Sequence, residues 1–128
     1  MKTYESLDSI TIRVGQNAKE NDQLTMTSDP KHWWMHVSGC PGAHVVVCHE
    51  GDQLPREIKR DAMVLAVFHS QAPTSKMSLV DVTRVKHVMW MRQAGKVKLE
   101  GEVMELTIFM RREKERLERL LKTKDILK

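Results

Sequence analysis

A chain of 128 residues can bury one hydrophobic core but is too short for two independent domains. No apolar run approaches the roughly 20 residues of a membrane-spanning helix, and the polar start of the chain has no apolar export signal, so we expect a cytoplasmic protein without membrane contact. The formal net charge is +4, and residues 1–110 sum to zero (13 basic, 13 acidic), so the excess lies in residues 111–128 and predicts an anionic partner.

The first predicted elements are a strand and a helix separated by Gly15. Apolar and polar residues alternate over residues 10–14, which is the period of a half-buried strand. Asn17 followed three residues later by Glu20 is typical of a capping box, so a helix is expected to begin directly after Asn17. It should end before the Asp-Pro pair at Pro30, because the residue before a proline is pushed out of the helical region.

Two short apolar runs, Trp33–Val37 and Ala43–Cys48, flank a turn rich in Gly and Pro and predict a β-hairpin. If the loop is symmetric, His36 lies opposite His44, and both rings share one face of the hairpin with Trp34. The opposite face is apolar and predicts core. We expect the histidine face to be open to solvent.

The second half of the chain alternates helix and strand signals. A helix is expected to start at Pro55 and to run past His69 until Ala72-Pro73 interrupts its pattern. Residues 77–83, 85–91 and 103–109 are rich in β-forming side chains. The predicted fold is therefore a single compact α+β domain with a mixed, largely antiparallel sheet, two packed helices and a basic C-terminal helix; residues 1–110 form the core domain and residues 111–128 the terminal helix.

The tail from residue 111 contains neither Gly nor Pro and is expected to form a basic amphipathic helix. Its eight basic and four acidic side chains also allow ion pairs along an ordinary solvated surface, but the excess of positive charge favours contact with a polyanion. Four leucines fall on one side of the helix and predict docking through a narrow stripe: Leu117, Leu120, Leu121 and Leu127.

Histidines and cysteines cluster around the predicted hairpin at positions His36, Cys40, His44, Cys48 and His49. Imidazole and thiolate are the ligands that zinc prefers, but there is no CxxC or HxxxH pair, and Cys40 falls at the loop tip, roughly 13 Å along the strands from either paired histidine. We expect free thiols, because no export signal accompanies the two cysteines. No pattern positions a nucleophile beside a base. The sequence therefore predicts no metal, no cofactor and no enzymatic activity.

Aromatic and basic residues offer weaker signals for nucleic-acid binding. Trp34 could stack on a base. Lys86, His87, Trp90 and Arg92 mix positive charge with aromatic surface, which suits a surface that follows a phosphate backbone, although a solvated strand face explains them equally well.

Five sequence blocks follow one another along residues 10–95 and carry a family resemblance: Gly15–Leu24, Trp34–His36, Pro41–Val46, Asp61–Ser70 and Thr83–Val88. Together they resemble the RNA-binding domain of the NFACT family, which is the C-terminal module of the NFACT proteins of ribosome quality control and the whole of some short stand-alone proteins. Gln16 and Ala43 depart from the family pattern, which has a basic residue and a serine at these positions.

The resemblance implies a non-catalytic module that binds tRNA or ribosomal RNA and serves translation or ribosome quality control, with the ribosome as a further implied partner. It concerns this module alone, so the peptide-tailing activity of full-length NFACT proteins is not carried over. We expect one RNA-binding face, with phosphate contacts from the basic tail, formed by Asn17, Asn21, Asp22, Trp34, His36, His44, Lys86, Arg111, Arg112 and Arg116. The alternative is a protein-interaction module that docks on a ribosomal or other partner through the terminal helix.

Overall fold

Six strands form one antiparallel sheet in the computed structural model, which describes residues 1–71 and 77–125. In spatial order they are β1 (Lys2–Glu5), β2 (Thr11–Val14), β4 (Val45–Val47), β3 (Trp33–Val37), β5 (Met77–Arg84) and β8 (Met104–Phe109). With the three α-helices described below, this is the single compact α+β domain that the sequence predicts.

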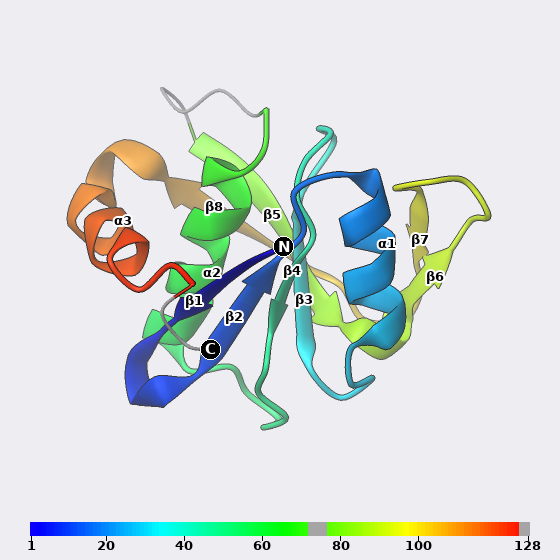
Figure 1. Cartoon of the computed structure of the whole chain (residues 1–128), viewed down its shortest axis with the longest axis horizontal. Coiled ribbons are helices and arrows are strands. Elements are labelled where there is room, and N and C mark those ends of the chain that lie inside the picture. The colour runs from blue at the N-terminus through cyan, green and yellow to red at the C-terminus, as the bar shows by residue number, and fades with distance from the viewer. Residues whose placement is uncertain (72–76, 126–128) are drawn as a thin grey trace.

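The two faces of the sheet are covered by different elements (Figure 1). Helices α2 (Arg56–Phe68) and α3 (Lys114–Leu121) pack on one face and bury the larger hydrophobic cluster. Helix α1 (Ala18–Thr27) and a two-stranded sheet of β6 (Val88–Trp90) and β7 (Val97–Leu99) cover part of the other face and bury a smaller one. The sheet therefore separates the molecule into an α2–α3 side and an α1 side.

Helix α1 begins where its capping pair predicts. The side chain of Asn17 accepts a hydrogen bond from the backbone amide of Glu20 (2.9 Å), and the carboxylate of Glu20 accepts one from the amide of Gln16 (3.0 Å). The helix ends at Thr27, before Asp29-Pro30, as expected.

The predicted hairpin is also present, and its register is the expected one. Met35 pairs with Val45 and Trp34 with Val46, so His36 comes opposite His44. The apolar face of the hairpin packs in the larger cluster beneath α2. Because this register is correct, the two histidines share the α1 side of the sheet.

The chain after β5 differs from the prediction. Residues 85–91 were expected to be β structure, but Val85–His87 forms a 3₁₀ turn, and β6 starts only after it. The backbone amide of Lys86 donates to the carbonyl of Pro30 (3.1 Å), which takes the chain out of the main sheet. Strands β1 and β7 have no counterpart in the prediction.

The two remaining helices are shorter than predicted. Helix α2 begins after Pro55 and ends at Phe68; the predicted stop at Ala72-Pro73 lies outside the described residues.

No helix among the described residues is long and apolar enough to cross a membrane.

The tail starts with a 3₁₀ turn (Met110–Arg112) before α3. Leu120 is fully buried in the larger cluster and Leu117 packs against it, whereas Leu121 is 37% exposed and Leu127 lies outside the described residues. The predicted leucine stripe therefore docks through two of its members, and a separate domain boundary at residue 110 stays a prediction.

Candidate nucleic-acid interface

A groove of about 720 Å³ opens on the α1 side of the sheet. Its walls come from the first turn of α1, the loop between β3 and β4, and the loop between β6 and β7. We refer to it as the α1 groove. Five of the predicted RNA-binding residues line it: Asn17, Asn21, Trp34, His36 and His44.

Asn21 and Asp22 hold the walls of the α1 groove together. The side chain of Asn21 accepts a hydrogen bond from the amide of His44 (3.0 Å) and donates one to the carbonyl of Gly42 (3.2 Å), which ties α1 to the β3–β4 loop. The carboxylate of Asp22 accepts from the amide of Gly95 (3.1 and 3.2 Å), which ties α1 to the β6–β7 loop. Both side chains thus have structural partners within the chain.

Trp34 is not the exposed stacking platform that the sequence predicts. Its side chain is 1% exposed and packs with Leu24 and Val46, because α1 lies across this part of the sheet. The indole N–H donates to the hydroxyl of Thr25 (3.2 Å). A buried indole can form part of the groove floor but cannot offer both faces to a base.

His36 and His44 lie side by side, as the hairpin register predicts. Their ring centroids are 5.5 Å apart with perpendicular planes, and the ring of His36 also stacks on Trp34 at 5.9 Å with 20° between the planes. The expectation of a solvent-open pair is correct only for His36, which is half-buried; His44 is 1% exposed.

Both imidazoles are held in the neutral form near neutral pH. Burial lowers the pKa of His44 to about 4, with a further lowering from the neighbouring His36, against an opposing effect of Asp22. Burial also lowers the pKa of His36. Across the sheet, burial and the neighbouring Glu105 raise the pKa of Asp81, a carboxyl group that lines the same groove. The α1 groove therefore has little positive charge of its own.

The other predicted residues do not share this face. Lys86 lines a second cavity of about 470 Å³. Arg111 and Arg112 are exposed next to α3, and the guanidinium of Arg112 lies 4.6 Å from the ring centroid of Phe109. These residues therefore do not lie beside the α1 groove, because the sheet lies between helix α3 and helix α1 (Figure 1), and their role in RNA binding stays a prediction.

Arg116 is occupied by an internal ion-pair network. Its guanidinium contacts the carboxylates of Asp61 (2.7 Å), Glu57 (2.7 Å) and Glu113 (2.6 Å), and its side chain is only 14% exposed. Asp61 is fully buried and also pairs with Arg119 (2.6 Å). These hydrogen bonds raise the pKa of Arg116 against the effect of burial. Arg116 therefore fastens α3 to α2 and has little capacity left for a phosphate.

The β6–β7 hairpin carries the exposed basic surface next to the α1 groove. Residues 85–99 contain no acidic residue, and Arg92, Lys96 and Lys98 lie on the hairpin itself, whereas Lys86 precedes it. Lys98 also forms an exposed ion pair with Glu100 directly after β7 (3.5 Å). Trp90 is 46% exposed on this hairpin, and Lys96 lines the groove. Figure 1 shows the hairpin beside α1. In the sequence, Trp90 and Arg92 belong to a weak signal for nucleic-acid binding, and Lys96 and Lys98 are not part of it. The lack of acidic residues over positions 85–99 is the pattern that could have identified the two lysines.

Comparison with known proteins now decides the family. Residues 1–112 match the family described as the NFACT protein RNA binding domain. The chain belongs to this family. The match covers most of the chain and includes the α1 groove and the β6–β7 hairpin.

Relatives and a solved structure agree with this assignment. The chain is 33% identical over 89 residues to the Rqc2 homolog RqcH of Bacillus subtilis (strain 168), and 38% identical over 85 residues to that of Streptococcus suis (strain 05ZYH33). These alignments cover 69% and 65% of this chain but 15% of each relative. The C-terminal part of the fibronectin/fibrinogen-binding protein from Streptococcus suis superimposes with a TM-score of 0.81 at 27% identity, over 93% of this chain and 48% of that one.

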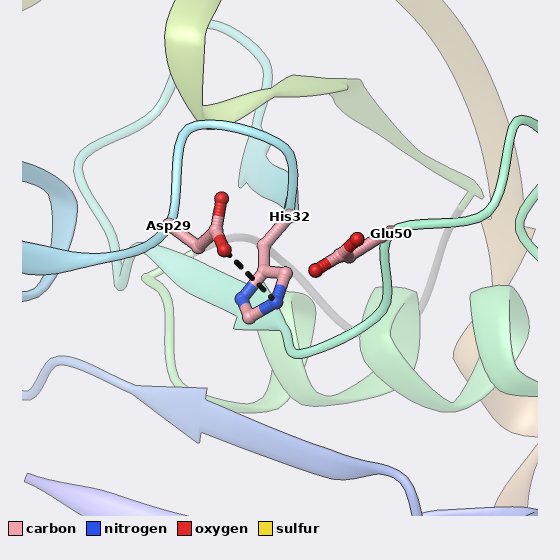
Figure 2. A group of neighbouring side chains, drawn as sticks. All are labelled: Asp29, His32 and Glu50. Atoms are coloured by element: carbon pink, nitrogen blue, oxygen red, sulfur yellow. Dashed lines mark ion pairs between the residues drawn. The ribbon is translucent and has the colours of Figure 1, made fainter.

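One further group of polar side chains meets away from the α1 groove. Figure 2 shows this group, which consists of Asp29, His32 and Glu50. Each residue offers one atom that could bind a metal, and these atoms all lie within 4.8 Å of one another. Nε2 of His32 lies 4.0 Å from a carboxylate oxygen of Asp29. Both carboxylates are exposed. The guanidinium of Arg84 donates to the carbonyls of Lys31 (2.6 Å) and Glu50 (2.8 Å), so the two loops are joined without a metal, and we assign no ligand to the group.

Proposed function

We propose that this chain binds RNA through the α1 side, with phosphates on the β6–β7 hairpin and the α1 groove beside them. The observation that carries the proposal is the basic stretch of residues 85–99, free of acidic residues and bearing an exposed Trp90, next to a groove in a member of an RNA-binding domain family. Lysine and arginine side chains release counterions from phosphates, and an exposed indole stacks on bases of any sequence.

The second part of the proposal concerns the cellular process in which the chain acts. The curated relatives are named as Rqc2 homologs, and the chain spans about 15% of their length. We therefore propose a role as the RNA-contacting module in a translation-linked process such as ribosome quality control, in the cytoplasm, with tRNA or ribosomal RNA as the ligand class. A binding module of this kind needs no catalytic group, which agrees with the non-enzymatic reading of the sequence.

A salt titration tests the RNA contact. The affinity of the full chain for a tRNA transcript is measured by fluorescence anisotropy over a series of KCl concentrations. The triple variant Arg92→Gln, Lys96→Gln, Lys98→Gln should bind more weakly, and the slope of log affinity against log salt should become shallower by about 2, because each lost phosphate contact removes a little under one counterion.

A matched variant removes the same charge from the opposite side of the molecule. Arg111, Lys114 and Lys122 are exposed in or next to α3, and replacing all three by Gln should leave the salt slope close to that of the parent chain. If instead the α3 variant loses affinity and the hairpin variant does not, the phosphate contact lies on the tail, as the sequence alone predicts. Failure of the parent chain to bind would refute the proposed function.

A further inference from the structure

The polar floor of the α1 groove is formed by neutral groups and not by cations. Among the described residues that line it, Lys96 is the one lysine or arginine and Asp81 the one carboxylate. His36 and His44, which lie between these walls, have pKa values lowered by burial. A phosphate placed on this floor would meet two neutral imidazoles and a carboxylate, so the floor disfavours an anion.

His44 is fixed in position by contacts on three sides. Its backbone amide donates to Asn21 (3.0 Å), and its ring meets Trp34 edge to face at a centroid distance of 5.1 Å. Its Nδ1 lies 2.9 Å from the hydroxyl oxygen of Thr25. A side chain that is 1% exposed and held in this way is preorganised.

Thr25 holds the Nδ1 side of the His44 ring against helix α1. The hydroxyl oxygen of Thr25 accepts the indole N–H of Trp34 (3.2 Å) and lies 2.9 Å from His44 Nδ1. The backbone of Asn21 also interacts with the ring and raises its pKa, against the larger effect of burial. The ring of His44 is therefore fixed by α1 on one side.

His44 lines the α1 groove although the residue is 1% exposed, so only an edge of its ring can meet a ligand there. No hydrogen bond joins a ring nitrogen of His36 to another described residue, and the ring of His36 stacks on Trp34. The groove thus presents a fixed neutral imidazole next to a stacked aromatic ring.

We propose that the α1 groove receives an unpaired nucleobase, which hydrogen-bonds with the groove-facing edge of the His44 ring and packs against His36, while the neighbouring phosphates contact the β6–β7 hairpin. The inference rests on the proposed function and specifies its ligand as single-stranded RNA. A base inside a duplex cannot enter, because its edge is paired and its faces are stacked. The unpaired edge of any of the bases carries hydrogen-bonding groups that can meet a neutral imidazole.

The main test compares two ligands with the unmodified protein. One is a short single-stranded RNA, and the other has the same length and the same phosphates but abasic residues in place of its bases. Both affinities are measured by fluorescence anisotropy at one salt concentration, together with that of a duplex of the same sequence. We expect the abasic strand and the duplex to bind at least about tenfold more weakly, since one stacked and hydrogen-bonded base contributes about that factor.

The possible results separate the two proposals. Equal affinity for the RNA and the abasic strand overturns the nucleobase inference and leaves RNA binding intact. Equal affinity for the duplex overturns it as well. If none of the three ligands binds, the proposed function is itself wrong, and the inference falls with it.

Two substitutions of His44 then locate the contact. In His44→Asn the shorter amide can reach only the position of Nδ1, whereas in His44→Gln the amide can reach the position of Nε2 and hydrogen-bond with a base there. His44→Gln should retain more affinity for the RNA than His44→Asn, and neither should change binding of the abasic strand. Loss of abasic binding in either variant would show a damaged fold and remove that variant from the comparison, while the ligand test with the unmodified protein still decides.

Discussion

Acidification should destabilise the fold through His44, and the size of the effect follows from its burial. Burial and the neighbouring His36 lower the pKa of the folded-state ring from 6.5 to about 4, while Asp22 opposes them. In the unfolded chain the ring binds a proton near pH 6.5, so between these two values the unfolded state holds more protons and stability falls as the pH falls. The stability that the neutral His44 ring contributes to the fold is fully present above about pH 6.5 and is lost as the pH approaches 4.

The expected loss is substantial for a domain of this size. One pKa unit corresponds to about 1.4 kcal/mol, so the full difference is on the order of 3 kcal/mol, of which about 2 to 3 kcal/mol should disappear between about pH 7.5 and about pH 4.5. A small domain has a total stability of only about 5 to 15 kcal/mol. The effect should therefore be visible in ordinary unfolding curves.

Urea unfolding followed by circular dichroism at a series of pH values measures this loss. His44→Gln is the matched variant, because glutamine does not titrate and can still donate into the groove. His36 and His69 have lowered pKa values in both proteins and add the same background. The free energy of unfolding of the parent chain should fall by about 2 kcal/mol more than that of the variant over this range. Parallel curves for the two proteins would refute the assignment of His44 as a buried neutral imidazole.

Three further changes test the scaffold around the groove. Asp61→Asn should destabilise the fold by about 3 kcal/mol or more, because Arg116 keeps its charge and loses a fully buried partner; a change below about 1 kcal/mol in urea unfolding would show that the ion-pair network is dispensable. Gly15→Ala should cost about 1 to 3 kcal/mol, since a Cβ there would lie 2.3 Å from the side-chain oxygen of Asn21, and an unchanged unfolding midpoint would contradict that contact. Trp90→Ala should change stability by less than about 0.5 kcal/mol, because the indole is 46% exposed. The same substitution should weaken single-stranded RNA binding about tenfold in anisotropy titrations. Unaltered RNA affinity would show that the indole is not part of the interface.

The local elements around the site could be predicted because they depend on neighbours in the sequence. The cap at Asn17 uses an amide three residues later, and the pairing of His36 with His44 follows from the loop length and the alternation of side chains along strands. Both predictions are confirmed. Strand β1 has too few residues to give a period, and its partners come from β2 and from the segment after α3.

Exposure could not be predicted in the same way, because it depends on which element covers which face. The hairpin pattern places Trp34 and the two histidines on one face but says nothing of α1, which lies across that face and buries Trp34 and His44. The same limit applies to charge. Arg116 looks like a free cation in the sequence, and the three carboxylates that pair with it come from α2 and from the residue before α3.

The net charge of a long segment also conceals local clusters of charged residues. Residues 1–110 balance to zero, yet three basic residues, Arg92, Lys96 and Lys98, are gathered on one hairpin that has no acidic residue within it. The tail, where the surplus was counted, directs two of its arginines inward to Asp61. Net charge therefore predicted the kind of partner but not the surface that would meet it.

The order of residues alone was enough to define the start of α1, the β3–β4 hairpin with the register of its histidines, and the membership of an RNA-binding family, since each of these depends on short-range geometry or on spaced motifs. Packing decided which tryptophan stays accessible, which arginines are paired with carboxylates and which histidine is buried. These properties arise from contacts between segments far apart in the chain, and an amino-acid sequence specifies such contacts only through the completed fold.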